Sequence, residues 1–130
     1  MKRTLSAAVA LALLAIANAA PAQERNREFD RLVRQAGAAY EAHDAATAIS
    51  TLERAYAIRP MGRLLFNLGR AHELNNDFAT AADYYRRFLA TNPEGQSASV
   101  AQEALGIAER RAAQQAEERR QREAAQQAEA

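Results

Sequence analysis

Four side chains on one predicted helix have types and spacing suited to binding a peptide. Arg63 and Arg70 lie seven residues apart, so two helical turns bring them to one face together with Phe66 and Asn67. An amide can hydrogen bond to an extended backbone, and guanidinium groups bind carboxylates. The same pattern also fits two solvated surface arginines beside a phenylalanine that simply packs. The sequence leaves both interpretations open.

The residues that most enzymes use are sparse. The chain has no cysteine, which excludes disulfides, thiolate metal sites and cysteine nucleophiles. We expect His43 in a solvated turn and His72 packed between helices, and no spacing of histidines and carboxylates indicates a metal site. Neither a glycine-rich phosphate loop nor a Gly-x-Ser-x-Gly elbow occurs. We therefore expect no enzymatic activity, no metal site and no cofactor.

The stretch 61–93 contains these candidate residues and predicts two amphipathic helices joined by a polar turn. From Phe78 onward, apolar residues recur at offsets of 0, 3, 4, 7, 10 and 11, which places them on one helical stripe. Asp77 precedes that helix and is expected to cap its free N–H groups. Pro93 ends the unit, because proline cannot continue a helix.

The same pattern occurs a second time, upstream of this stretch. Asp44 and Pro60 precede Asp77 and Pro93 by 33 positions, and a stripe with the same offsets begins at Ala45. A further stripe of this spacing begins at Phe29 and predicts a first helix over about 25–42. A period near 34 with two helices in each copy indicates an array of helical repeats, and therefore an all-α fold.

In these residues the chain resembles the tetratricopeptide repeat (TPR) family over about half its length. The segment 65–69 is similar to the family's W-x-x-L-G motif with leucine in place of tryptophan, and Gly69 is expected to let two helices approach closely. Further matching positions are Ala81, Tyr85 and Pro93 in the second copy and Leu32, Ala36, Ala48, Leu52, Ala55 and Pro60 in the first. Gln35 and His72 depart from the pattern, which prefers leucine and tyrosine there.

The resemblance implies a concave groove lined by the first helix of each hairpin. It places Val33, Gly37, Tyr40 and Glu41 in the groove from the first copy, and Arg63, Phe66, Asn67, Arg70, Glu73 and Leu74 from the second. The family's carboxylate clamp needs lysine and asparagine at the positions of Val33 and Gly37, so that specialised form is not expected. Because groove residues vary freely in such scaffolds, the resemblance does not name a ligand.

Residues 1–22 have the pattern of a cleaved signal peptide. Lys2 and Arg3 precede an apolar run over 5–17, and small residues at the end favour cleavage after Ala22, with Ala19 as the second choice. An uncleaved anchor is the alternative, but the run of about 13 residues is shorter than the roughly 20 that span a bilayer. We expect an exported bacterial protein, periplasmic or secreted, without stable membrane insertion after cleavage.

The remaining chain divides into a repeat domain at 23–108 and a tail at 109–130. The domain comprises repeats at about 29–61 and 62–95 and a capping helix at about 97–108, whose expected apolar stripe is Val100, Ala104, Ile107 and Ala108 with Leu105 beside it. The tail contains AAQQAE twice and good helix formers but no large apolar residue. It is expected to be helical and exposed, a single helix rather than a coiled coil.

Charge gives no general attraction to nucleic acid or acidic lipid. The chain has 17 basic and 16 acidic residues, and loss of Lys2 and Arg3 with the signal peptide leaves a net charge of −1. The sequence therefore predicts a non-enzymatic interaction module that binds a peptide or partner protein in the groove. The alternative is an oligomeric scaffold that assembles through the tail.

Overall fold

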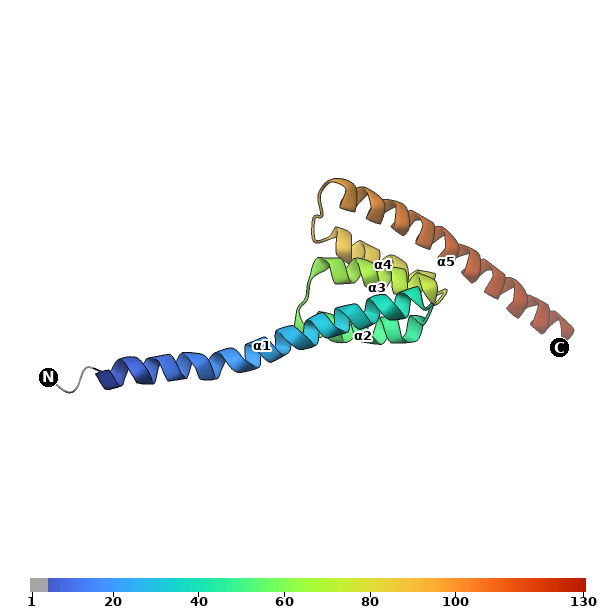
Figure 1. Cartoon of the computed structure of the whole chain (residues 1–130). Helices are drawn as coiled ribbons and strands as arrows, with labels where there is room; N and C mark the ends of the chain where they lie inside the picture. The colour runs from blue at the N-terminus through green and yellow to red at the C-terminus, as the bar shows by residue number, and fades with distance from the viewer. Residues whose placement is uncertain (1–4) are drawn as a thin grey trace.

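Figure 1 shows the computed structural model, which describes the backbone of residues 5–130 and the side chains of residues 21–130. These residues form five helices, α1 (Leu5–Glu41), α2 (Ala45–Ile58), α3 (Gly62–Leu74), α4 (Phe78–Leu89) and α5 (Gly95–Glu129). Each helix packs against the next one along the chain. The predicted all-α fold class is confirmed.

The third helix, α3, is the centre of the packing. On one side its Leu64, Leu68 and Ala71 are buried in a cluster with residues of α1 and α2. On the other side Leu65 packs with Phe88 of α4 and a buried alanine of α5. Because α3 is apolar on two sides, its remaining narrow face is the one that carries polar side chains.

The turns before α2 and α4 have the same geometry. Asp44 and Asp77 each cap the following helix, and each side chain accepts a hydrogen bond from the backbone N–H of the threonine three residues later. The residue before each cap, His43 or Asn76, has a positive φ, at 58° and 56°. The backbone N–H groups of Asp44 and Asp77 both donate to a carbonyl five residues back, at 2.9 Å. The period in the sequence therefore corresponds to a repeated local structure, and the predicted caps are confirmed.

The first helix begins earlier than the sequence pattern indicated. It starts at Leu5 rather than near residue 25, and it continues through Pro21, whose missing N–H removes one hydrogen bond from the helix. Lys2 and Arg3 of the predicted signal peptide lie outside the described residues. In the part of the chain that the structure describes, no helix combines the length and the apolar character needed to span a bilayer.

The last helix turns a different face to the domain than expected. Ala101 and Ala108 are fully buried, whereas Val100 and Ile107 are 44% and 41% exposed. The predicted stripe is therefore correct at Ala104 and Ala108 and wrong at Val100 and Ile107, where Ala101 takes the place of Val100. The physical reason lies in α4, whose bulky Tyr85 and Phe88 fill the interface, so that the fully buried positions of α5 are alanines.

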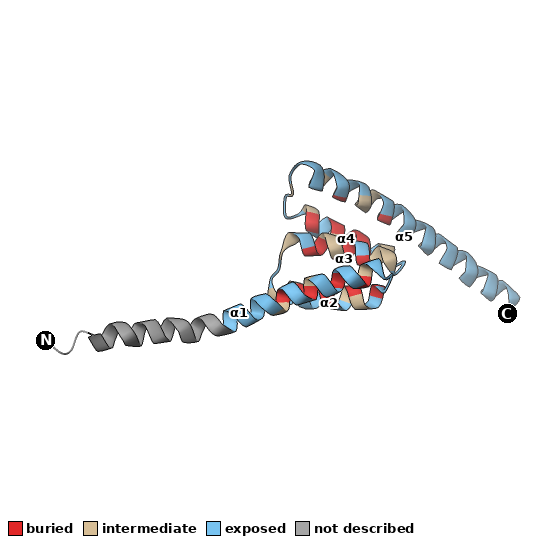
Figure 2. Cartoon of the chain, viewed as in Figure 1, coloured by how far each residue is buried: buried red, intermediate tan, exposed pale blue. Residues whose placement is uncertain are grey.

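One continuous helix, α5, includes both the expected capping helix and the tail. Ala104 and Leu105 are partly buried against α4, and Gln115 still donates a hydrogen bond to the carbonyl of Asn76 at 2.9 Å. From residue 117 onward every residue is exposed, and the end of α5 extends beyond the other helices (Figure 2). Packing thus continues several residues past Ala108, where the large apolar residues of the sequence stop.

Candidate functional site

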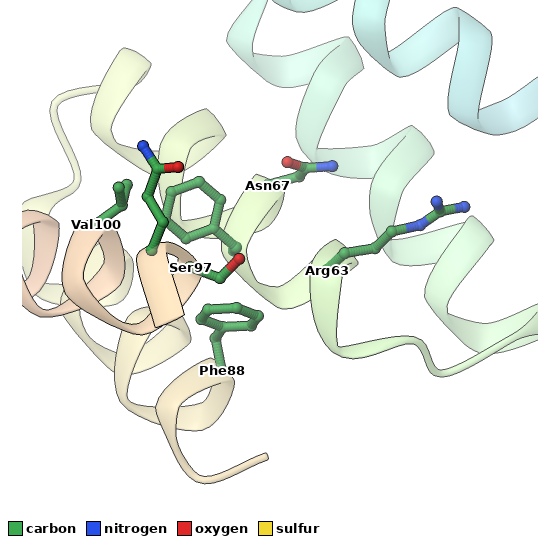
Figure 3. A pocket seen from close by; sticks show the side chains of 7 residues that line it. Arg63, Asn67, Phe88, Ser97 and Val100 are labelled. Atoms are coloured by element: carbon green, nitrogen blue, oxygen red, sulfur yellow. The ribbon is translucent and has the colours of Figure 1, made fainter. Parts of the chain in front are cut away.

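Two cavities lie on one side of the molecule and meet at Asn67. The first, about 310 Å³, lies between α3 and α5 and is lined by Arg63, Phe66, Asn67, Phe88, Gln96, Ser97 and Val100 (Figure 3). The second, about 460 Å³, lies between α1 and α3 and is lined by Val33, Ala36, Gly37, Tyr40, Glu41, Leu52, Asn67 and Arg70. Together they form one surface, which we call the α1–α3–α5 groove.

Most of the predicted groove residues lie in these cavities. Val33, Tyr40, Asn67 and Arg70 line the α1–α3 cavity, with Gly37 and Glu41, which the resemblance had also placed in the groove. Arg63, Phe66 and Asn67 line the α3–α5 cavity. Glu73 and Leu74 line neither cavity, although both are only partly buried. The face shared by Arg63, Phe66, Asn67 and Arg70 is therefore the groove side of α3.

The sequence interpretation missed the contribution of α5. Val100, Gln96 and Ser97 form the far wall of the α3–α5 cavity, and Ile107 follows Val100 by two helical turns on the same face. The sequence spacing could have predicted that Val100 lines the groove. Val33, Phe66 and Val100 follow one another at nearly equal intervals, each close to the repeat period. Val100 thus stands about one period after Phe66, a spacing that the alanine-rich sequence of α5 made hard to recognise.

Phe66 belongs to the floor of the groove and to the core. Its ring centroid lies 5.4 Å from that of Tyr85 and 5.5 Å from that of Phe88. Contacts at these separations stabilise aromatic pairs. Substitution of Phe66 would therefore disturb folding as well as binding, and the polar groove residues are better probes of function.

Arg70 is held in place by an aromatic side chain of the neighbouring hairpin. Its guanidinium carbon lies 4.6 Å from the centroid of the Tyr40 ring, and its Nη2 donates a hydrogen bond to the Tyr40 hydroxyl at 3.1 Å. Within residues 21–130, Arg63 and Asn67 have no side-chain hydrogen bond or ion pair with another side chain. The polar groups of these two lining residues are therefore unpaired within that part of the chain.

Beside the groove, Glu73 accepts a hydrogen bond from the Tyr85 hydroxyl at 2.8 Å. Burial raises the pKa of the Tyr85 phenol well above its ordinary value, and the hydrogen bond to the Glu73 carboxylate adds to the rise. The phenol therefore remains a donor to Glu73 over the whole physiological pH range. This contact gives Glu73 a structural partner.

The histidines do not form a joint site. His72 stacks on Tyr84 with ring centroids 5.2 Å apart, its Nδ1 lies 3.3 Å from a carboxylate oxygen of Asp77, and its Nε2 is buried without a partner. His43 is exposed in the turn before α2. Among the described residues, no three His, Cys, Asp or Glu side chains gather as a metal site would require.

The α1–α3–α5 groove combines apolar and polar side chains. It has an apolar floor, unpaired polar groups at Arg63 and Asn67, and one oriented cation at Arg70. Comparison of the chain with protein-family models, with curated proteins and with solved structures finds no match to any of them.

Proposed function

We propose that this chain is a TPR-like interaction module that binds an extended peptide segment of a partner protein in the α1–α3–α5 groove. The observation that carries the proposal is the meeting of two cavities at Asn67 on the side where α1, α3 and α5 face outward. The repeated caps at Asp44 and Asp77 support the repeat interpretation, because the same turn geometry recurs one repeat later.

The chemistry of the groove favours a peptide over a small polar ligand. Phe66, Phe88 and Val100 offer an apolar depression for a side chain, and Asn67 can bond a peptide backbone between the two cavities. Arg63 and Arg70 favour acidic groups of the ligand. The module has no catalytic role in this proposal, and its partner is a protein or peptide rather than a nucleic acid.

The location that fits this function is the bacterial periplasm or the exterior. The support is the signal-peptide pattern of residues 1–22, with its basic start, its apolar run and its small residues before Ala22. Two hairpins and one further helix are fewer than the three repeats that usually close a repeat core. Binding of a partner would therefore also stabilise the fold.

An oligomeric scaffold remains the second candidate, and one observation favours it. The end of α5 from residue 117 is exposed along its full length and extends away from the domain (Figure 2). A helix with no intramolecular role is available for assembly. Against this, its only apolar side chains are alanines, and a stable coiled coil needs a seam of larger residues.

Site-specific photo-crosslinking in the cell tests the binding proposal. A benzophenone amino acid replaces Val100, which is apolar, partly exposed and within the groove. We expect a crosslink to a discrete partner protein, and we expect Arg63→Glu to reduce its yield severalfold because the reversed charge repels acidic groups of the ligand. The measurement is the intensity of the shifted band and its identification by mass spectrometry.

The matched control places the same amino acid at Glu53, an exposed residue of α2 that lines neither cavity. No crosslink to that partner is expected from this position. A partner that crosslinks from residue 53 and not from residue 100 would place the interaction outside the groove and refute the proposal.

A further inference from the structure

We propose that the α1–α3 cavity is a carboxylate subsite, in which Tyr40 holds the Arg70 guanidinium ready for one acidic side chain of the bound peptide. The inference rests on the proposed function and adds the chemical class of the ligand. It assigns different preferences to the two cavities, an acidic residue between α1 and α3 and an apolar residue between α3 and α5.

Tyr40 orients the Arg70 side chain before any ligand binds. A free arginine side chain loses rotamer entropy when it binds a ligand, but the Tyr40 ring at 4.6 Å and its hydroxyl at 3.1 Å already fix the guanidinium. The hydrogen bond to Tyr40 uses one of five N–H donors. The remaining N–H groups can donate two parallel hydrogen bonds to a carboxylate, the bidentate geometry typical of arginine.

Arg70 has no acidic partner among the described residues. Some arginines of the domain pair with carboxylates, as Arg54 does with Glu28 at 3.0 Å and Arg86 with Glu109 at 2.8 Å, whereas others among residues 21–130, such as Arg63, do not. Arg70 has no carboxylate within 4 Å among residues 21–130. The acid nearest to it along α3, Glu73, is engaged by the Tyr85 hydroxyl. Arg70 is thus an oriented cation beside a cavity that holds no acid paired to it.

The α1–α3 cavity is lined by apolar side chains and one carboxylate. Val33, Ala36 and Leu52 line it with apolar surface beside the exposed Arg70, and a bound peptide that displaces water there would strengthen an ion pair. Glu41 also lines the cavity and is exposed. Its negative charge opposes an acidic ligand, so removal of that charge should strengthen binding, whereas removal of the Arg70 charge should weaken it.

Selection of peptides from a random heptapeptide display library tests the subsite. The full chain is the bait, and sequencing of the bound peptides shows which residue types are enriched. We expect peptides with one Asp or Glu at a fixed distance from an apolar residue. With Arg70→Gln as the bait, the acidic preference should disappear while the apolar preference remains. Arg110→Gln is the matched control, because Arg110 is an exposed arginine of α5 that lines neither cavity, and this variant should keep the acidic preference.

Titration of one selected acidic peptide then measures the roles of the individual groups. We expect Arg70→Gln to raise its dissociation constant about tenfold, which corresponds to 1.4 kcal/mol. Arg70→Lys should restore only part of the affinity, because lysine lacks the planar fork. Tyr40→Phe keeps the ring stack and removes the hydroxyl, and it should weaken binding about threefold without changing the melting temperature. Glu41→Gln should tighten binding.

The outcomes separate this inference from the proposed function. Peptides that bind without acidic enrichment, or whose acidic preference survives Arg70→Gln, would overturn the carboxylate subsite and leave the groove proposal standing. Equal effects of Arg110→Gln and Arg70→Gln would show general attraction to positive charge rather than a subsite and would also overturn it. Failure to select any peptide with the wild-type chain would contradict the subsite and the peptide-binding function together.

Discussion

Replacement of Gly69 by alanine is expected to destabilise the domain by about 2 kcal/mol or more, because the new methyl group overpacks the interface between α3 and α4. A Cβ atom at this position would lie 2.5 Å from Cε1 and 2.7 Å from Cδ1 of Tyr85. Tyr85 is fully buried and cannot swing away, so the ring or the α3 and α4 backbones must shift. Overpacking of this kind costs about 3 kcal/mol, which outweighs the gain of about 1 kcal/mol in helix propensity.

Thermal unfolding followed by circular dichroism measures the effect. A loss of about 2 kcal/mol in a domain of this size lowers the melting temperature by roughly 10 °C. Gly37→Ala is the matched control, because Gly37 is also inside a helix but a Cβ there meets nothing within 4 Å. That variant should be more stable than the wild type by about 0.5–1 kcal/mol. Equal effects of the two substitutions would show that α3 and α4 do not approach as closely as described.

Truncation after residue 94 is expected to abolish cooperative folding. The deletion removes α5 and uncovers Tyr85 and Phe88, together with the buried alanines of α4 and Leu65 of α3. Burial of one large apolar side chain contributes about 1.5–3 kcal/mol. Exposure of several approaches the whole free energy of unfolding, which is on the order of 5–10 kcal/mol for such a domain. The measurement is the loss of a sigmoidal thermal transition.

Truncation after Ala116 is the matched control and should leave the melting temperature unchanged. Residues 117–130 are exposed and contribute only exposed charge pairs such as that between Glu118 and Arg122. Light scattering on the same pair of proteins also separates the two proposed functions. The peptide-binding module predicts an equal oligomeric state before and after truncation. An oligomer that dissociates when residues 117–130 are removed would favour the scaffold.

Local features of the repeat were predictable because they depend on short stretches of sequence. The caps at Asp44 and Asp77 follow from residue type and position, and the close approach at Gly69 follows from the motif around it. Helical spacing predicted that Arg63 and Arg70 share one face of α3, and the resemblance to the TPR family predicted that this face lines the groove. Each of these inferences needed no knowledge of packing between distant residues.

The orientation of α5 was not predictable by the same reasoning. Apolar residues occur around much of its circumference, and the larger ones, Val100 and Ile107, were assigned to the buried side. The fully buried positions of α5 are instead alanines, because Tyr85 and Phe88 of α4 leave little space there. Residue size at a tight interface depends on the partner surface, which hydrophobic periodicity does not encode. The contact of Arg70 with Tyr40 was also not predictable, because it depends on how the two hairpins pack against each other.

The most direct test of the groove is amide NMR of the full chain during titration with a peptide selected by display. Binding in the α1–α3–α5 groove predicts that the largest shifts map to the residues around Val33, Asn67 and Val100, one on each of the three helices. Small shifts are expected for the exposed residues of α2 and for residues 117–130 of α5. Shifts confined to α2, α4 or the end of α5 would contradict the proposed binding surface.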